Sequence, residues 1–148
     1  MADLESQTQS AALRILGRLY AHEVAGIIRY LHYSFLIMGH NRIPIQKWLR
    51  EQADEGIAHS VLVGEKITSL GGAIPVIVAN SGESHARTLD EILAEALEFE
   101  EQALKLYREL ATEAAATDDI ALEELARQQI FSEQDHADAV RKMLRRPA

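Results

Sequence analysis

Glutamate and histidine recur at one separation in the two halves of this 148-residue chain. His59 follows Glu23 by 36 residues, and His136 follows Glu100 by the same 36 residues. Carboxylate and imidazole groups together form binding sites for iron, manganese or zinc. If each half folds as a hairpin of two helices, the repeat places one Glu and one His from each half around one site. The pattern therefore predicts a metal centre built by two similar halves.

A further carboxylate precedes each of these histidines. Glu133 lies three residues before His136. In the first half the nearest carboxylate is Glu55, four residues before His59, and the position that corresponds to Glu133 is Gly56. Spacings of three and four both place two side chains on one helix face, so both pairs can bind a shared ion. We expect a one-residue π-bulge at Gly56 to turn Glu55 toward the site, because such bulges favour functional sites.

The elements that must carry these residues are helices. The chain has only 3 prolines and 8 glycines, and alanine, leucine and glutamate, which favour helix, dominate it. Thr88 and Glu91 match a capping box, and residues 73–87 form a long connection. We predict helices at about 3–38, 44–70, 88–116 and, after a cap at 117–119, up to 145. The result is an all-α four-helix bundle with one long crossover between helices two and three, as a single domain over 1–148.

Each predicted helix carries a carboxylate at or beside a position that should face the core. An unpaired buried carboxylate costs several kcal/mol, so it must be paired, protonated or bound to metal. Six groups of ligand type at matching depths favour the metal-bound alternative. They are Glu23, Glu55, His59, Glu100, Glu133 and His136.

At these residues the sequence resembles the ferritin-like superfamily, most closely its bacterioferritin branch. The segment from Glu23 to Tyr30 is similar to the first-helix motif of that family, and Glu133–His136 matches its Glu-x-x-His motif in the last helix. Residues 97–100 and 54–59 are similar to the motifs of the third and second helices, the latter with the shift at Glu55. The resemblance covers nearly the whole chain and implies a carboxylate-bridged di-iron centre.

The resemblance also implies a role for each residue. Glu23 and Glu100 would be the carboxylates of the single-ligand helices, Glu55 and Glu133 would bridge or chelate, and His59 and His136 would each bind one iron. Tyr30 would act near the site as a donor, or would be a core tyrosine with a satisfied hydroxyl. The implied reaction is that of a ferroxidase, which oxidises Fe(II) to Fe(III) with dioxygen or peroxide, with iron storage or detoxification as its purpose. Manganese or zinc could occupy the same ligands.

Two family features have no counterpart in this sequence. Bacterioferritins bind haem through a methionine just after the second-helix Glu, but Gly56 and Ile57 follow Glu55, so no haem is expected. No segment for the short fifth helix of cage-forming members follows Arg145, which argues against a full cage. We nevertheless expect self-association, at least into a homodimer, through the first two helices. The candidate pairing residues are Leu31, Phe35, Ile37 and Trp48.

Two other functions stay open. One is a di-iron or di-manganese peroxidase or oxygenase that acts on something other than iron; the other is a structural bundle with a degenerate site, which Gly56 supports. The absence of cysteine excludes disulfides, thiolate metal sites and a self-contained rubrerythrin. A net charge of −8 disfavours nucleic acid as the main partner. No uncharged apolar stretch of about 18 residues occurs, so we expect no membrane span and a cytoplasmic protein.

Some expectations concern surfaces rather than the site. The apolar run Ile74–Val78 is expected to cover a bundle edge or a neighbouring subunit. Four histidines fall off the inward stripes and are expected at the surface or in an interface: His22, His32, His40 and His85.

Overall fold

Four α-helices make up the part of the chain that the structure describes, which has no strand. The computed structural model describes residues 10–74, 76 and 84–147. The helices are α1 (Ala11–Leu36), α2 (Arg42–Ser69), α3 (Leu89–Ala116) and α4 (Ile120–Leu144). The predicted all-α fold and order of helices are confirmed. The predicted start of the first helix, near Asp3, lies outside the described residues.

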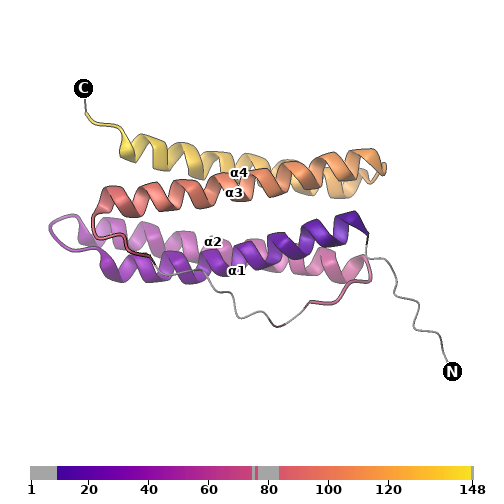
Figure 1. The fold of residues 1–148 in the computed structure, drawn as a ribbon, viewed down its shortest axis with the longest axis horizontal. Helices are drawn as coiled ribbons and strands as arrows, with labels where there is room; N and C mark the ends of the chain where they lie inside the picture. The colour runs from indigo at the N-terminus through magenta and orange to yellow at the C-terminus, as the bar shows by residue number, and fades with distance from the viewer. Residues whose placement is uncertain (1–9, 75, 77–83, 148) are drawn as a thin grey trace.

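The helices pack as two antiparallel hairpins (Figure 1). Close packing joins α1 to α2, α3 to α4, and α1 to α3. α2 ends and α3 begins at opposite ends of the bundle, so the connection between them must run its length (Figure 1). The predicted long crossover between the second and third helices is therefore confirmed. None of the described helices is long and apolar enough to cross a membrane.

Side-chain caps set where three of the helices begin. The Ser10 hydroxyl accepts a hydrogen bond from the Leu13 amide, and Asp119 caps α4 in the same manner. Thr88 and Glu91 form the predicted capping box, in which each side chain accepts from the backbone of the other residue. Such caps satisfy amides that have no partner inside the helix. The caps of α3 and α4 place their starts close to those predicted. The prediction that the first helix begins near Asp3 is wrong, because the backbone of Ser10 is not helical and its cap starts α1 at Ala11.

Two apolar clusters flank a polar layer at the middle of the bundle. One contains Leu16, Leu19, Val63, Tyr107, Leu110 and Leu122. The other, toward the opposite end, contains Tyr30, Tyr33, Leu49, Ala53, Ile92 and Ala96. Between these levels along the helices lie the buried carboxylates of Glu23, Glu100 and Glu133. The apolar clusters therefore stabilise the bundle and hold charged groups at a fixed depth.

Glycines let α1 approach its two neighbours closely. A Cβ on Gly56 would lie 3.0 Å from Cγ1 of Ile27, and a Cβ on Gly26 would lie 2.7 Å from the Phe99 ring. α2 is α-helical throughout Arg42–Ser69, so the π-bulge expected at Gly56 is wrong. The physical reason is that Gly56 serves the α1–α2 contact, which needs a regular helix without a side chain at this point.

Two expectations about surfaces need correction. Ile37 is buried in an apolar cluster, because the chain turns extended at the C-terminus of α1, so it cannot belong to an exposed pairing surface. His22 is half-buried rather than exposed, because α1 contacts α3 as well as α2. His32, His40 and His85 are exposed as expected. In the run Ile74–Val78, Ile74 packs against the core and Val76 is exposed, while residues 75, 77 and 78 lie outside the described residues.

Candidate metal centre

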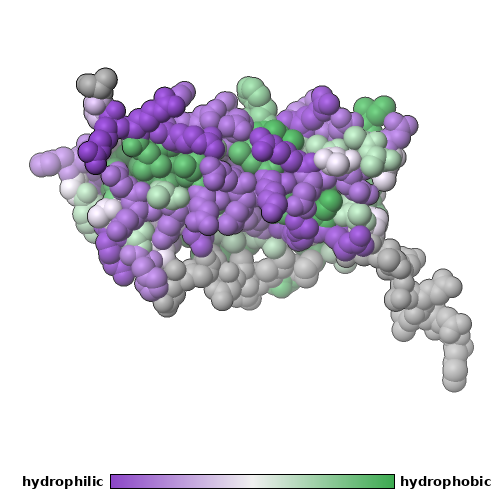
Figure 2. Space-filling model, turned by 45° about the horizontal axis from the view of Figure 1, so that its top comes forward, coloured by the Kyte–Doolittle hydropathy of each residue, from purple (hydrophilic) through white to green (hydrophobic). Residues whose placement is uncertain are grey.

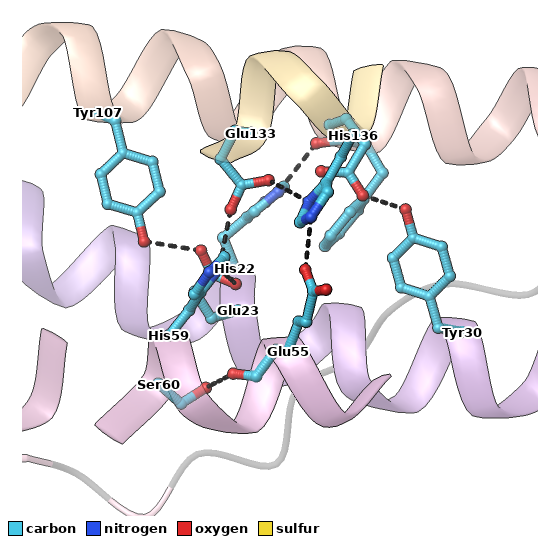
Figure 3. Close-up of polar contacts among 12 residues, drawn as sticks. His22, Glu23, Tyr30, Glu55, His59, Ser60, Tyr107, Glu133 and His136 are labelled. Atoms are coloured by element: carbon cyan, nitrogen blue, oxygen red, sulfur yellow. Dashed lines mark hydrogen bonds and ion pairs between the residues drawn. The ribbon is translucent and has the colours of Figure 1, made fainter. Parts of the chain in front are cut away.

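Carboxylates and imidazoles from all four helices point into one cavity in the middle of the bundle (Figure 3). The structure thus brings together all six ligand-type residues that the sequence singles out. α1 supplies Glu23, α2 supplies Glu55 and His59, α3 supplies Glu100, and α4 supplies Glu133 and His136. The cavity has a volume of about 20 Å³.

One group of ligands lies between α1, α2 and α4. The imidazole Nδ1 of His59 lies 2.9 Å from Oε1 of Glu133 and 3.5 Å from Oε2 of Glu23. The three side chains are almost fully buried. With no metal present, the imidazole thus pairs with two carboxylates that would otherwise repel each other.

A second group of ligands lies between α3 and α4, and Glu55 on α2 reaches it from the side. Nδ1 of His136 lies 3.4 Å from Oε2 of Glu133, and its Nε2 contacts the carboxylate of Glu55. Glu100 lies in the same group, within reach of both α4 residues. Glu55 differs from the others because its side chain is largely exposed.

Two tyrosines hold the carboxylates of the single-ligand helices. The Tyr107 hydroxyl donates a 2.8 Å hydrogen bond to Oε1 of Glu23, and the Tyr30 hydroxyl donates to Oε1 of Glu100. Burial raises the pKa of both phenols, and the neighbouring carboxylates raise it further. Both hydroxyls therefore stay protonated and act as donors. Tyr30 thus contacts a predicted ligand, which favours the donor alternative for this residue.

Hydrogen bonds and neighbouring charges within the site shift the pKa values of its ionisable groups. Burial alone lowers the pKa of His59, but hydrogen bonds to Glu133 and Glu23 outweigh burial and raise this pKa to about 10. Burial also opposes the charge of Glu133, yet hydrogen bonds with His136, His59 and Glu100 lower the pKa of that carboxyl. The carboxylates and imidazoles of the site are therefore paired with one another.

Glu100 behaves differently from its neighbour Glu133. Burial and the adjacent Glu133 carboxylate raise the pKa of Glu100 well above the usual range, so these two carboxyls share one proton. A divalent cation would replace this proton, because it supplies the positive charge that both oxygens need.

The donor set fits two metal ions. Glu23, His59 and Glu133 offer ligand atoms that lie within 4.8 Å of one another, and so do Glu100, Glu133 and His136. Glu133 belongs to both groups, so its two oxygens face two adjacent positions. Oxygen and imidazole ligands without thiolate suit iron, manganese or zinc.

Three residues of the site are not among those predicted from the spacing of glutamate and histidine. Tyr107 lies 77 residues after Tyr30, the same offset as between Glu23 and Glu100, so the repeat itself contains the signal for it. His22 stacks on Phe99 with ring centroids 3.9 Å apart, and its Nε2 lies 3.0 Å from the Phe99 carbonyl oxygen. Phe99 lines the cavity beside Gly26. His22 and Phe99 also lie 77 residues apart, at corresponding positions of the two halves, so the repeat aligns them, but only the contact of α1 with α3 stacks their rings.

The comparisons with known proteins agree with this architecture. The sequence model of a family described as "Ferritin-like domain" matches residues 13–147. A crystal structure of ferritin-like, diiron-carboxylate proteins from Bacillus anthracis str. Ames has a similar fold, with a TM-score of 0.76 and 24% sequence identity. The match covers 93% of this chain and 100% of that chain. No curated protein sequence matches.

Proposed function

Since this chain belongs to the ferritin-like domain family, we propose that it binds two iron ions in the bundle core and oxidises Fe(II) to Fe(III). The observation that carries the proposal is the pair of three-ligand groups that share Glu133. A shared carboxylate between two imidazole–carboxylate groups is the arrangement that a two-metal site requires. The similar fold described as diiron-carboxylate supports iron as the metal.

The small cavity favours small species as the reactants at the ligands. A volume of about 20 Å³ holds small species about the size of a water molecule. Metal ions and dioxygen or hydrogen peroxide are of this size, whereas an organic substrate would need a larger opening among the ligands. The peroxidase or oxygenase alternative uses the same ligands, and turnover of hydrogen peroxide without iron deposition would favour it.

The reaction balances with either oxidant. Two Fe(II) ions give two electrons to one dioxygen, which takes up two protons and becomes hydrogen peroxide. With hydrogen peroxide as the oxidant, two electrons and two protons produce two water molecules. Two adjacent ions can supply both electrons at once, so no one-electron oxygen product has to leave the site.

The residues of the chain bind, orient and exchange protons. Tyr107 and Tyr30 fix Glu23 and Glu100 so that one oxygen of each carboxylate accepts from a phenol and the other faces the cavity. Binding of two cations expels the proton that Glu100 and Glu133 share and the proton on His59. Those protons become available near the reacting oxygen atoms. Phe99 and Gly26 close the cavity on the side of α1 and α3.

The test compares Fe(II) oxidation by the wild-type chain, Glu133→Gln and Glu51→Gln. Glu133 belongs to both ligand groups, whereas Glu51 is an exposed carboxylate on α2 that pairs with Lys47. We expect aerobic Fe(III) formation well above the rate in buffer for the wild type and for Glu51→Gln, and a loss of at least about 100-fold for Glu133→Gln. Oxidation no faster than in buffer, with no iron bound, would favour the degenerate bundle instead.

We also propose that the outer face of α1 and α2 joins two copies of the chain. Ile28, Leu31 and Phe35 recur on one exposed stripe of α1, and Ile57 and Val61 are exposed on α2. The face of the molecule that Figure 2 shows is by contrast mostly hydrophilic, with separate hydrophobic spots. Sedimentation of Leu31→Glu against Phe131→Glu, an exposed site on α4, tests the assignment. Only Leu31→Glu is expected to reduce the mass; an unchanged mass would contradict it.

A further inference from the structure

We propose that the two metal positions are unequal, and that Glu55 captures ions from solvent and loads the outer position. The outer position is the one formed by Glu100, Glu133 and His136, and the inner position is the one formed by Glu23, His59 and Glu133. This inference rests on the proposed function, because it requires a pair of metal ions in the cavity.

α2 supplies its carboxylate from a position one residue away from the one that faces the core. The helix position three residues before His59 is Gly56, and a Cβ there would lie 3.0 Å from Ile27 Cγ1 and 3.5 Å from the Glu23 carbonyl oxygen. α1 therefore occupies the space that a side chain would need. Glu55 lies one residue earlier, about 100° around the helix. The α2 carboxylate thus approaches the cavity from its rim rather than from the core.

The outer position differs from the inner one in having an exposed carboxylate beside it. The Glu55 side chain is 46% exposed, and its partner His136 is 17% exposed. In the inner group the side chains of His59 and Glu23 are 12% and 7% exposed. Both positions line the same cavity, but only the outer one has an exposed carboxylate, that of Glu55, beside it.

On the side of α2 and α4 the cavity is bounded by side chains rather than by close backbone packing. Close backbone packing joins α1 to α2, α3 to α4 and α1 to α3. α2 and α4 instead meet through side chains of the site, with His59 paired to Glu133 and Glu55 to His136 (Figure 3). The contact between Glu55 and His136 is the outer of these two pairs. Opening it needs only side-chain rotation, because Glu55 is exposed and no helix has to move.

Loading then follows from the chemistry of the pair. Glu55 is an exposed anion that attracts a divalent cation. When the cation binds Glu55, Nε2 of His136 loses its carboxylate partner, releases its proton to solvent and can then bind the ion through the freed lone pair. The ion then lies between Glu55 and the outer ligands, Glu100 and Glu133. Glu55 is therefore a ligand that moves, whereas Glu23 is held in place by Tyr107.

The experiment measures Co(II) binding, because Co(II) absorbs visible light and is stable in air, so binding is separated from iron oxidation. The metal-free wild type, Glu55→Gln, Glu23→Gln and Glu51→Gln are titrated, and bound cobalt is counted by equilibrium dialysis with elemental analysis. Stopped-flow absorbance gives the loading rates. Glu51 is the matched control, because it lies one turn before Glu55 on α2 and its side chain is 54% exposed.

We expect two Co(II) per chain for the wild type and for Glu51→Gln. Glu55→Gln should keep one tightly bound ion, weaken the second at least about tenfold, and slow its loading by a similar factor. Glu23→Gln should weaken the other ion and leave loading through Glu55 intact. Two ions with unchanged affinities and rates in Glu55→Gln would overturn this inference alone. Fewer than two ions in the wild type would overturn the proposed function as well.

Discussion

The buried hydroxyl of Tyr107 on α3 donates a 2.8 Å hydrogen bond to the buried carboxylate of Glu23 on α1. Tyr30 on α1 donates in the opposite direction, to Glu100 on α3. A tyrosine of each hairpin therefore donates a hydrogen bond to the glutamate carboxylate of the other hairpin. The internal repeat is thus more than a duplicated ligand pattern, because its two halves stabilise each other across the α1–α3 contact.

Tyr107→Phe should destabilise the metal-free chain by about 1–3 kcal/mol, because Glu23 would lose a donor in a buried site. Urea denaturation of metal-free protein measures the change. Glu23→Gln combined with Tyr107→Phe provides the control, since the second substitution should cost less once the carboxylate is gone. Additive effects of the two substitutions would show that the hydrogen bond contributes nothing.

The free energy of unfolding of the metal-free chain should fall as pH rises from about 6.5 toward 10. The pKa of His59 is raised from 6.5 to about 10, so its contribution is complete below pH 6.5 and is lost as pH rises through the folded value. The raised pKa of Glu100 acts in the same direction. The loss should be on the order of a few kcal/mol, and urea denaturation at pH 6 and pH 9 measures it.

The same protons predict how metal binding depends on pH. Because cations displace the protons held at His59 and at the Glu100–Glu133 pair, metal uptake should release protons and its affinity should rise with pH over this window. Zinc titration into weakly buffered protein with a pH indicator measures the release. Uptake without proton release would contradict the description of the site as a set of paired, proton-holding groups.

Gly26→Ala should destabilise the fold by about 1–3 kcal/mol, because the new Cβ would lie 2.7 Å from the Phe99 ring. Gly17, on the same helix, has nothing within 4 Å of such a Cβ. Gly17→Ala should therefore stabilise the chain by roughly 0.5–1 kcal/mol through the helix preference of alanine. Thermal melts give the melting temperatures of both variants. Equal changes in melting temperature would contradict a close approach of α1 and α3 at Gly26.

Gln129→Met should stabilise the chain by about 1 kcal/mol. The buried Oε1 of Gln129 has no hydrogen-bond partner within the described part of the chain, and methionine has a similar length without the polar oxygen. Gln128→Met is the control, because Gln128 is exposed and its amide donates to Glu124, so its removal should change little. A lower melting temperature for Gln129→Met would mean that bound water satisfies the oxygen.

Most of the fold could be predicted because helix formation depends on local properties. Few breaks, a capping box at Thr88–Glu91 and apolar residues three and four apart are enough to predict four helices and their order. The ligand residues could be found for the same reason. Glu100, Glu133 and His136 occupy regular positions on the inward stripes, where a charge is unusual enough to be noticed.

The errors arose where two helices meet. A stripe drawn on one helix at a time places His22 outside, but α1 faces both α2 and α3, so this residue lies against Phe99. The shifted position of Glu55 and the glycine beside it predict a π-bulge at Gly56, which α2 does not have. The contact of Gly56 with Ile27 shows instead why α2 stays regular and why a glycine occurs there.

The four helices, the repeat and the six candidate ligands can be read from the residue order, because helical periodicity sets which side chains share a face. How those faces meet is visible only in the folded bundle. It pairs Tyr107 with Glu23 and brings Glu55 to His136 from the rim of the cavity. The physical reason is that the separation and rotation of helices depend on side chains of two elements at once, and no pattern within one element contains that contact.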